Sequence, residues 1–143
     1  MNMNNEAVEV IQRLSKQYNY YREAYLFTLE VIHLSSQKIK KSEGKPRHLS
    51  CGEFANEFVD FAKLKFGILA DTVLEQWNVH TSKDIGILVF SLIESGMMSK
   101  NENDSLEQFD GLFEIKDVSR YDWKKDFDSG NIQYMHFTTG IKN

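Results

Sequence analysis

Hydrophobic side chains recur every three or four residues through the first two thirds of the chain, a spacing that predicts amphipathic helices. About five segments show this spacing, at residues 5–18, 21–40, 51–66, 69–78 and 82–95. The second segment is apolar around most of its circumference between Ala24 and Leu34, so we expect it to be the central helix. The sequence therefore predicts a mainly α-helical fold.

Two of these helices carry a recognisable start signal. Ser50 with Glu53, and Thr81 with Asp84, place a hydroxyl and a carboxylate three residues apart. In a capping box each of these side chains binds the other residue's backbone N–H at the helix N-terminus. We therefore expect helices to begin directly after Ser50 and Thr81.

The periodicity changes after Gly96. Phe109, Phe113 and Ile115 fall on alternate positions, which favours a small β element, although Ser105 could equally cap a short helix. A helix, a turn, a strongly amphipathic helix and then this element would together resemble a winged helix.

Residues 117–143 form a C-terminal extension in which we predict a β-hairpin. Aromatic and aliphatic residues alternate with polar ones on both sides of an Asp-Ser-Gly turn at 128–130. Two isolated strands are only marginally stable in water, so the aromatic face of the hairpin is expected to lie on the helical body.

Length and composition fit one compact domain spanning residues 1–143. With 41% hydrophobic and 27% charged residues, the chain is neither disordered nor fibrous. No apolar run approaches the roughly 18 residues needed to cross a bilayer. The N-terminus lacks a secretory signal pattern, and the single cysteine cannot form an internal disulfide, so we expect a cytoplasmic protein with no membrane association.

Charge is segregated along the chain. Basic residues gather between 38 and 47 and acidic ones between 101 and 117, which allows complementary surfaces within one molecule or between two copies. The formal net charge of −4 argues against a nucleic-acid binder. The helix at 82–95 also lacks the basic polar face that a DNA-reading helix needs.

The central helix offers the polar groups Glu23, Glu30 and His33. Glu30 and His33 have the i, i+3 spacing by which a helix presents two metal ligands, but a di-metal bundle site needs this pair twice. The sequence contains no second Glu-x-x-His and no HxH or HExxH motif. We therefore expect no metal and no cofactor, and a partly buried His33 bound to a neighbour.

Arg47 and His48 precede a helix N-terminus, where a guanidinium and an imidazole could form an anion pocket for phosphate or carboxylate. Alternatively, Arg47 pairs with Glu23 or Glu30 and pins the preceding loop. Cys51 lies in the first turn of the same helix, where the dipole and nearby cations could lower its thiol pKa. It could equally be a small residue that fills this turn.

Several short sequence motifs, taken in their order along the chain, resemble those of an uncharacterised bacterial family restricted mainly to the Verrucomicrobia and Planctomycetes. The similarity covers about residues 18–114 and rests on Glu23-Ala24-Tyr25, Arg47-His48 ahead of Ser50, Phe66-Gly67, Trp77 and LIESGMMSK at 92–100. The resemblance implies a small, mostly helical protein with no assigned activity. The family usually has glycine where Cys51 stands, which argues against a shared cysteine mechanism.

No constellation of catalytic residues emerges from these patterns. The leading hypothesis is a non-enzymatic cytoplasmic protein–protein interaction module that binds a protein partner or itself. The first alternative is an enzyme or small-molecule binder with an anion pocket at Arg47 and His48. The second alternative is a winged-helix-like transcriptional regulator.

Overall fold

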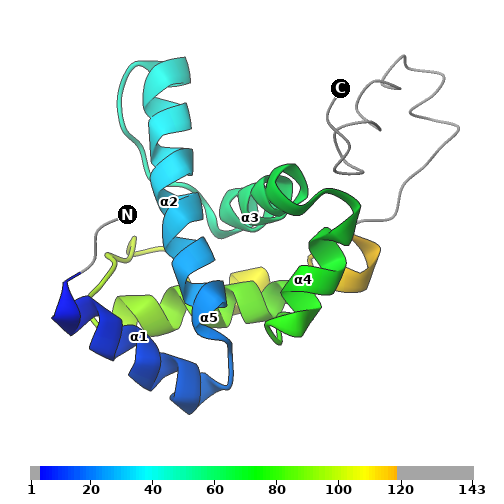
Figure 1. Cartoon of the computed structure of the whole chain (residues 1–143). Helices are drawn as coiled ribbons and strands as arrows, with labels where there is room; N and C mark the ends of the chain where they lie inside the picture. The colour runs from blue at the N-terminus through cyan, green and yellow to red at the C-terminus, as the bar shows by residue number, and fades with distance from the viewer. Residues whose placement is uncertain (1–3, 119–143) are drawn as a thin grey trace, which may run out of the picture.

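The computed structural model describes residues 4–118, which are mainly helical, as predicted (Figure 1). Its α-helices are α1 (Asn5–Tyr18), α2 (Arg22–Glu43), α3 (Cys51–Phe66), α4 (Ala70–Gln76) and α5 (Ser82–Glu94). Four of them have 13 or more residues, whereas α4 has seven. Short 3₁₀ turns follow at η1 (Gly67–Leu69), η2 (Leu106–Phe109) and η3 (Ile115–Asp117). None of the helices in this part of the chain is long and apolar enough to cross a bilayer.

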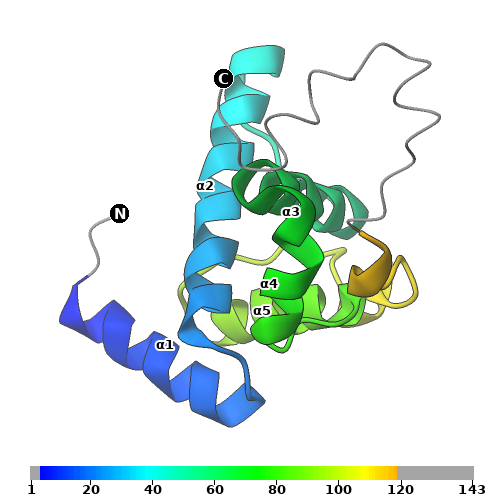
Figure 2. The same cartoon turned by 45° about the vertical axis from the view of Figure 1, so that its right-hand side comes forward.

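The central helix is α2, as the sequence predicted. It packs against α1, α3 and α5, and its C-terminal end projects beyond the other helices (Figures 1 and 2). Its buried positions recur at helical spacing and include Ala24, Tyr25, Thr28, Val31 and Ser35. The Tyr25 hydroxyl lies 3.0 Å from that of Ser91 on α5, so the two helices share a buried hydrogen bond.

Both predicted capping boxes are confirmed. The Ser50 hydroxyl accepts the Glu53 N–H at 3.1 Å, and the Glu53 carboxylate accepts the Ser50 N–H at 2.9 Å. At the start of α5, the Asp84 carboxylate accepts the Thr81 N–H at 3.0 Å and, in addition, the Tyr20 hydroxyl. The second box therefore fixes the start of α5 and also ties it to the α1–α2 connection.

The expected β element between Phe109 and Ile115 is wrong. These residues belong to η2, a connecting turn and η3, and the described residues contain no strand, only an isolated bridge between Thr81 and Glu114. The Ser105 N–H binds the Gln108 side chain at 3.0 Å, which stabilises the short helical turn that was the alternative.

The apolar residues at 109, 113 and 115 alternate because each successive turn of this segment directs a side chain toward the helical body. Its backbone pairs with the α4–α5 connection instead of with itself, through bonds from Ser82 N–H to Phe113 and from Ile115 N–H to His80. The hairpin that would have formed the wing of a winged helix is thus not made within 97–115. The predicted C-terminal hairpin lies outside the described residues.

The segment after α5 is held against that helix by close packing at Gly86. A Cβ atom at Gly86 would lie 2.7 Å from the ring of Phe109, which is too close for unchanged packing. The buried Ser82 hydroxyl donates to the Phe109 carbonyl at 2.6 Å and accepts the Leu112 N–H at 3.1 Å. Residues 106–113 therefore depend on a small residue in the middle of α5.

We predict that Gly86→Ala destabilises the protein despite the better helix propensity of alanine. The gain in propensity is up to about 1 kcal/mol, whereas overpacking a core costs about 1–3 kcal/mol. Urea unfolding should show a net loss in the free energy of unfolding. Gly52→Ala is the matched control, because its Cβ meets nothing within 4 Å, and it should be neutral or stabilising. Equal stability of the two variants would contradict the proposed packing.

Candidate functional site

The polar residues expected to form a site separate into two surfaces. Arg47 and His48 line a small cleft ahead of α3, whereas Glu23, Glu30 and His33 line a groove beside α2. The two sets therefore do not converge on one centre.

Arg47 is held between two carboxylates. Its Nε lies 3.0 Å from Glu43, and its Nη1 and Nη2 each lie 3.0 Å from an oxygen of Glu53. The expected pairing with Glu23 or Glu30 is wrong, because Arg47 binds the acids nearest to it along the chain. Hydrogen bonds from Arg47, and then from the Ser50 backbone, lower the pKa of Glu53 to about 2. An arginine already paired twice has little remaining capacity for an anion.

His48 joins the loop to the segment that follows α5. Its Nε2 lies 3.1 Å from the Asp104 carboxylate. The cleft beneath it has a volume of about 120 Å³ and is lined largely by apolar side chains, among them Ile39, Phe54 and Phe90. His48 therefore links the loop before α3 to the segment after α5, and its Nε2 faces a carboxylate of the chain itself.

Cys51 is a buried residue with a poorly ionised thiol. Its side chain is 7% exposed, and its Sγ lies 3.2 Å from the Gln108 Oε1. Burial, followed by the negative charge of Asp104, raises the pKa of Cys51 to about 11. The expectation of a lowered pKa is wrong, and the structure agrees with the alternative of a small residue filling the first helical turn.

A larger groove of about 720 Å³ lies between α2, the end of α3 and the end of α4. Its apolar lining consists of Leu26, Phe27, Leu34, Phe66 and Trp77. We call this surface, together with its polar residues Glu23, Glu30, His33 and Lys65, the aromatic groove.

Three rings in the aromatic groove form a mutually contacting cluster. Ring centres are 5.9 Å apart for Phe27 and Phe66, 5.8 Å for Phe27 and Trp77, and 5.6 Å for Phe66 and Trp77. Aromatic pairs at such separations attract beyond their simple area burial. Because the rings come from α2, from α3 and from the residue that follows α4, the cluster fixes the shape of the groove.

The polar side chains of the groove include one exposed ion pair. Lys65 Nζ lies 2.9 Å from Glu30 Oε1, and 5.8 Å and 5.9 Å from the ring centres of Phe27 and Phe66. Glu30 and His33 share the α2 wall, as their spacing predicted. His33 is exposed, so the expectation of a partly buried histidine is wrong. Within residues 4–118, no group of three or more His, Cys, Asp or Glu side chains has an arrangement that could hold a metal ion.

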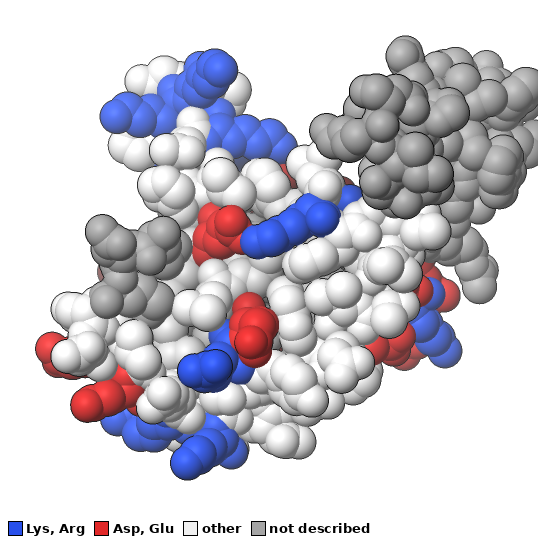
Figure 3. Space-filling view, viewed as in Figure 1, with Lys and Arg blue, Asp and Glu red and all other residues white. Residues whose placement is uncertain are grey.

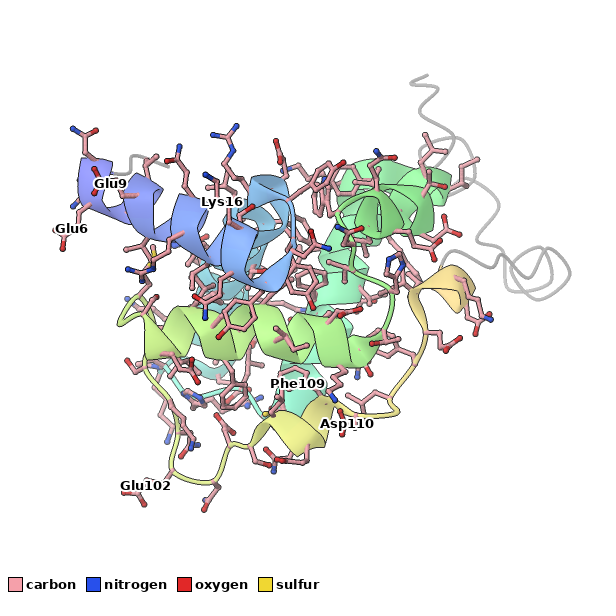
Figure 4. All side chains as sticks on the ribbon, turned by 90° about the horizontal axis from the view of Figure 1, so that it is seen from below. Glu6, Glu9, Lys16, Glu102, Phe109 and Asp110 are labelled. Atoms are coloured by element: carbon pink, nitrogen blue, oxygen red, sulfur yellow. The ribbon has the colours of Figure 1, made fainter. Side chains whose placement is uncertain are left out.

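Several large apolar side chains of α2, α3 and η1 are exposed. Leu64 is 70% exposed, Leu69 57%, Ile68 52% and Leu26 42%. Where no grey atoms cover it, the face of α2, α3 and α4 seen in Figure 3 carries few charged side chains, and cations gather on the projecting end of α2. The acidic residues Glu102 and Asp110 lie at the edge of the molecule opposite α1 (Figure 4).

Sequence reasoning found the polar residues of the groove on α2 but missed its aromatic partners. Phe66 and Trp77 appeared only as markers of the family resemblance, and Lys65 was not singled out. The sequence shows apolar residues at 64, 68 and 69 beside Phe66, but only the structure shows that they are exposed. Such a cluster exceeds the scattered surface apolar residues that are normal for a protein.

The Arg47 pairing predicts the ionisation of Glu53. In an NMR titration Glu53 should have a pKa of about 2, and Arg47→Met should raise it toward the ordinary 4.5. Because folding lowers this pKa, the stability from the pair is present above pH 4.5 and is lost as the pH falls toward 2. Lys38→Met removes another exposed cation, one paired with Glu57, and should leave Glu53 unchanged. Identical Glu53 titrations with and without Arg47 would refute the pairing.

The buried thiol predicts slow alkylation of Cys51. A rise in the pKa from 9.0 to about 11 depletes the thiolate, so iodoacetamide at pH 8 should react about 10- to 100-fold more slowly than with the unfolded chain. The control is the same protein in guanidinium chloride. Rapid labelling of the folded protein would instead indicate an activated cysteine.

The chain was compared with protein-family models, curated proteins and solved structures, and none of them matches it.

Proposed function

We propose that this protein is a non-enzymatic interaction module that binds a protein partner, or a second copy of itself, through the aromatic groove. The observation that carries the proposal is an open groove whose apolar lining includes three clustered rings and the exposed side chain of Leu26. Large exposed apolar surfaces are rare on folded monomeric domains, and where they occur they usually mark interaction sites.

The composition of the surface supports a protein ligand. Interface cores are enriched in aromatic residues, and tryptophan is among the residues that contribute most to binding energy. Trp77 and Phe66 are half-buried, so each ring is anchored by packing while part of it remains accessible. Rings fixed in this way lose little conformational entropy when a partner covers them.

The alternative, an enzyme or binder with an anion pocket at Arg47 and His48, has weaker support. Arg47 has two carboxylate partners, and His48 faces the carboxylate of Asp104. An incoming phosphate would have to replace these acids. The hypothesis of a winged-helix regulator also has weaker support. Residues 97–115 do not form the hairpin of a wing, and α5 lacks the basic polar face of a DNA-reading helix.

The resemblance to the bacterial family assigns no activity, so it neither favours nor opposes an interaction role. A cytoplasmic location remains the expectation from the sequence. The proposal therefore depends on the physical character of the groove and its surroundings.

Site-specific photo-crosslinking tests the proposal. A benzoyl-phenylalanine at position 26 or 69, on the apolar surface, should give discrete adducts in the native host cell. The same group at Glu102, which is exposed and away from the groove, should give none. An adduct with the mass of two chains would identify self-association. Equal labelling at all three positions, or none at any, would overturn the proposal.

A further inference from the structure

The partner's chemistry can be inferred from the charged groups of the aromatic groove, and this step rests on the proposed function. We propose that the groove receives a basic amphipathic helix of a partner protein. One cationic side chain of that helix lies over Phe27 and Phe66 against Glu30, and a second lies beside Glu23.

The groove already holds an ammonium group. Lys65 Nζ is within 6 Å of two ring centres and 2.9 Å from the Glu30 carboxylate. Aromatic faces attract cations at such distances, and a neighbouring carboxylate adds to the attraction. The position of the Lys65 ammonium group thus shows where a lysine or arginine of the partner would bind.

Lys65 is displaceable. Its side chain is 51% exposed and that of Glu30 41%, so the ion pair is well screened by solvent. Exposed pairs of this kind contribute little to stability, and the flexible lysine stem can turn into water. A partner's cation can replace Lys65 without leaving Glu30 unpaired.

Glu23 provides a second, open position. Glu23 and Glu30 lie seven residues apart on one face of α2, which is about 10.5 Å along the helix axis. Both line the groove, and no cation within residues 4–118 forms a salt bridge with Glu23. A helix with basic residues seven positions apart therefore matches both carboxylates.

The apolar part of the groove lies between these carboxylates. Phe27 occupies the middle of the interval on α2, and Trp77 faces it from the end of α4 at a ring separation of 5.8 Å. Apolar residues between the two cations of the partner would meet these rings. Helix-in-groove recognition uses this combination of apolar anchors and flanking charges.

The test uses the full chain carrying Trp123→Phe, so that Trp77 is the only tryptophan. The probe is an N-acetylated 14-residue helical peptide with lysines seven positions apart and two leucines between them. A matched peptide carries glutamine in place of both lysines. Trp77 fluorescence measures the affinity of each peptide.

We expect the lysine peptide to bind more tightly than the glutamine peptide. Glu23→Gln and Glu30→Gln should each weaken its binding about two- to fivefold. Lys65→Met should strengthen it by a similar factor, because it removes the internal competitor. Glu9→Gln, an exposed acid on α1, is the matched control and should have no effect.

Three results would overturn the inference. Equal affinity for both peptides would show an apolar groove without cation recognition, and the proposed docking function would stand. Weaker binding after Lys65→Met would mean that Lys65 is part of the surface the peptide contacts and is not displaced by it. Trp77 fluorescence that depends on protein concentration without peptide would assign the groove to a second copy, which the crosslinking experiment detects independently.

Discussion

Phe27 makes the contacts on which both the core and the candidate site depend. Its ring lies 5.0 Å from that of Phe58 in the core, and it also contacts Phe66 and Trp77 in the groove. Through these contacts one side chain of α2 joins α3 and α4 and supports the Lys65 ammonium. The opposite face of α2 binds α5 through Tyr25 and Ser91. A helix with two apolar faces needs a partner on each of them, and on the second face Phe27 is covered whereas Leu26 is still 42% exposed.

The charged residues of the two surfaces differ in how far apart their partners lie along the chain. Arg47 is neutralised by Glu43 and Glu53, residues close to it in the chain, so its pairing is set by loop geometry alone. The aromatic groove instead combines residues of α2, α3 and the end of α4, and its carboxylates lie beside the half-buried rings of Phe66 and Trp77. Arg47 and His48 pair with carboxylates of neighbouring segments, whereas the aromatic groove lies on another side of α2.

Features with local causes were predictable from the sequence. The capping boxes at Ser50 and Thr81 depend on residues three positions apart, and both formed as expected. The alternation from Phe109 to Ile115 was misleading, because consecutive turns on a helical body can bury alternate residues without a strand. The contact between Gly86 and Phe109, and the approach of Phe66 and Trp77 to Phe27, join segments far apart in the chain. No spacing rule within a single sequence reveals such pairs.

The central claim is that the aromatic groove is at once part of the packed structure and open to a ligand. Paramagnetic broadening by a soluble nitroxide, measured by NMR on the free full-length chain, tests this most directly. The account predicts strong broadening of the Trp77 indole and of the Leu26 and Leu69 methyl groups, while the methyl groups of Val31 and Leu88 in the core stay sharp. Protection of the groove signals to the same degree as the core signals would contradict it.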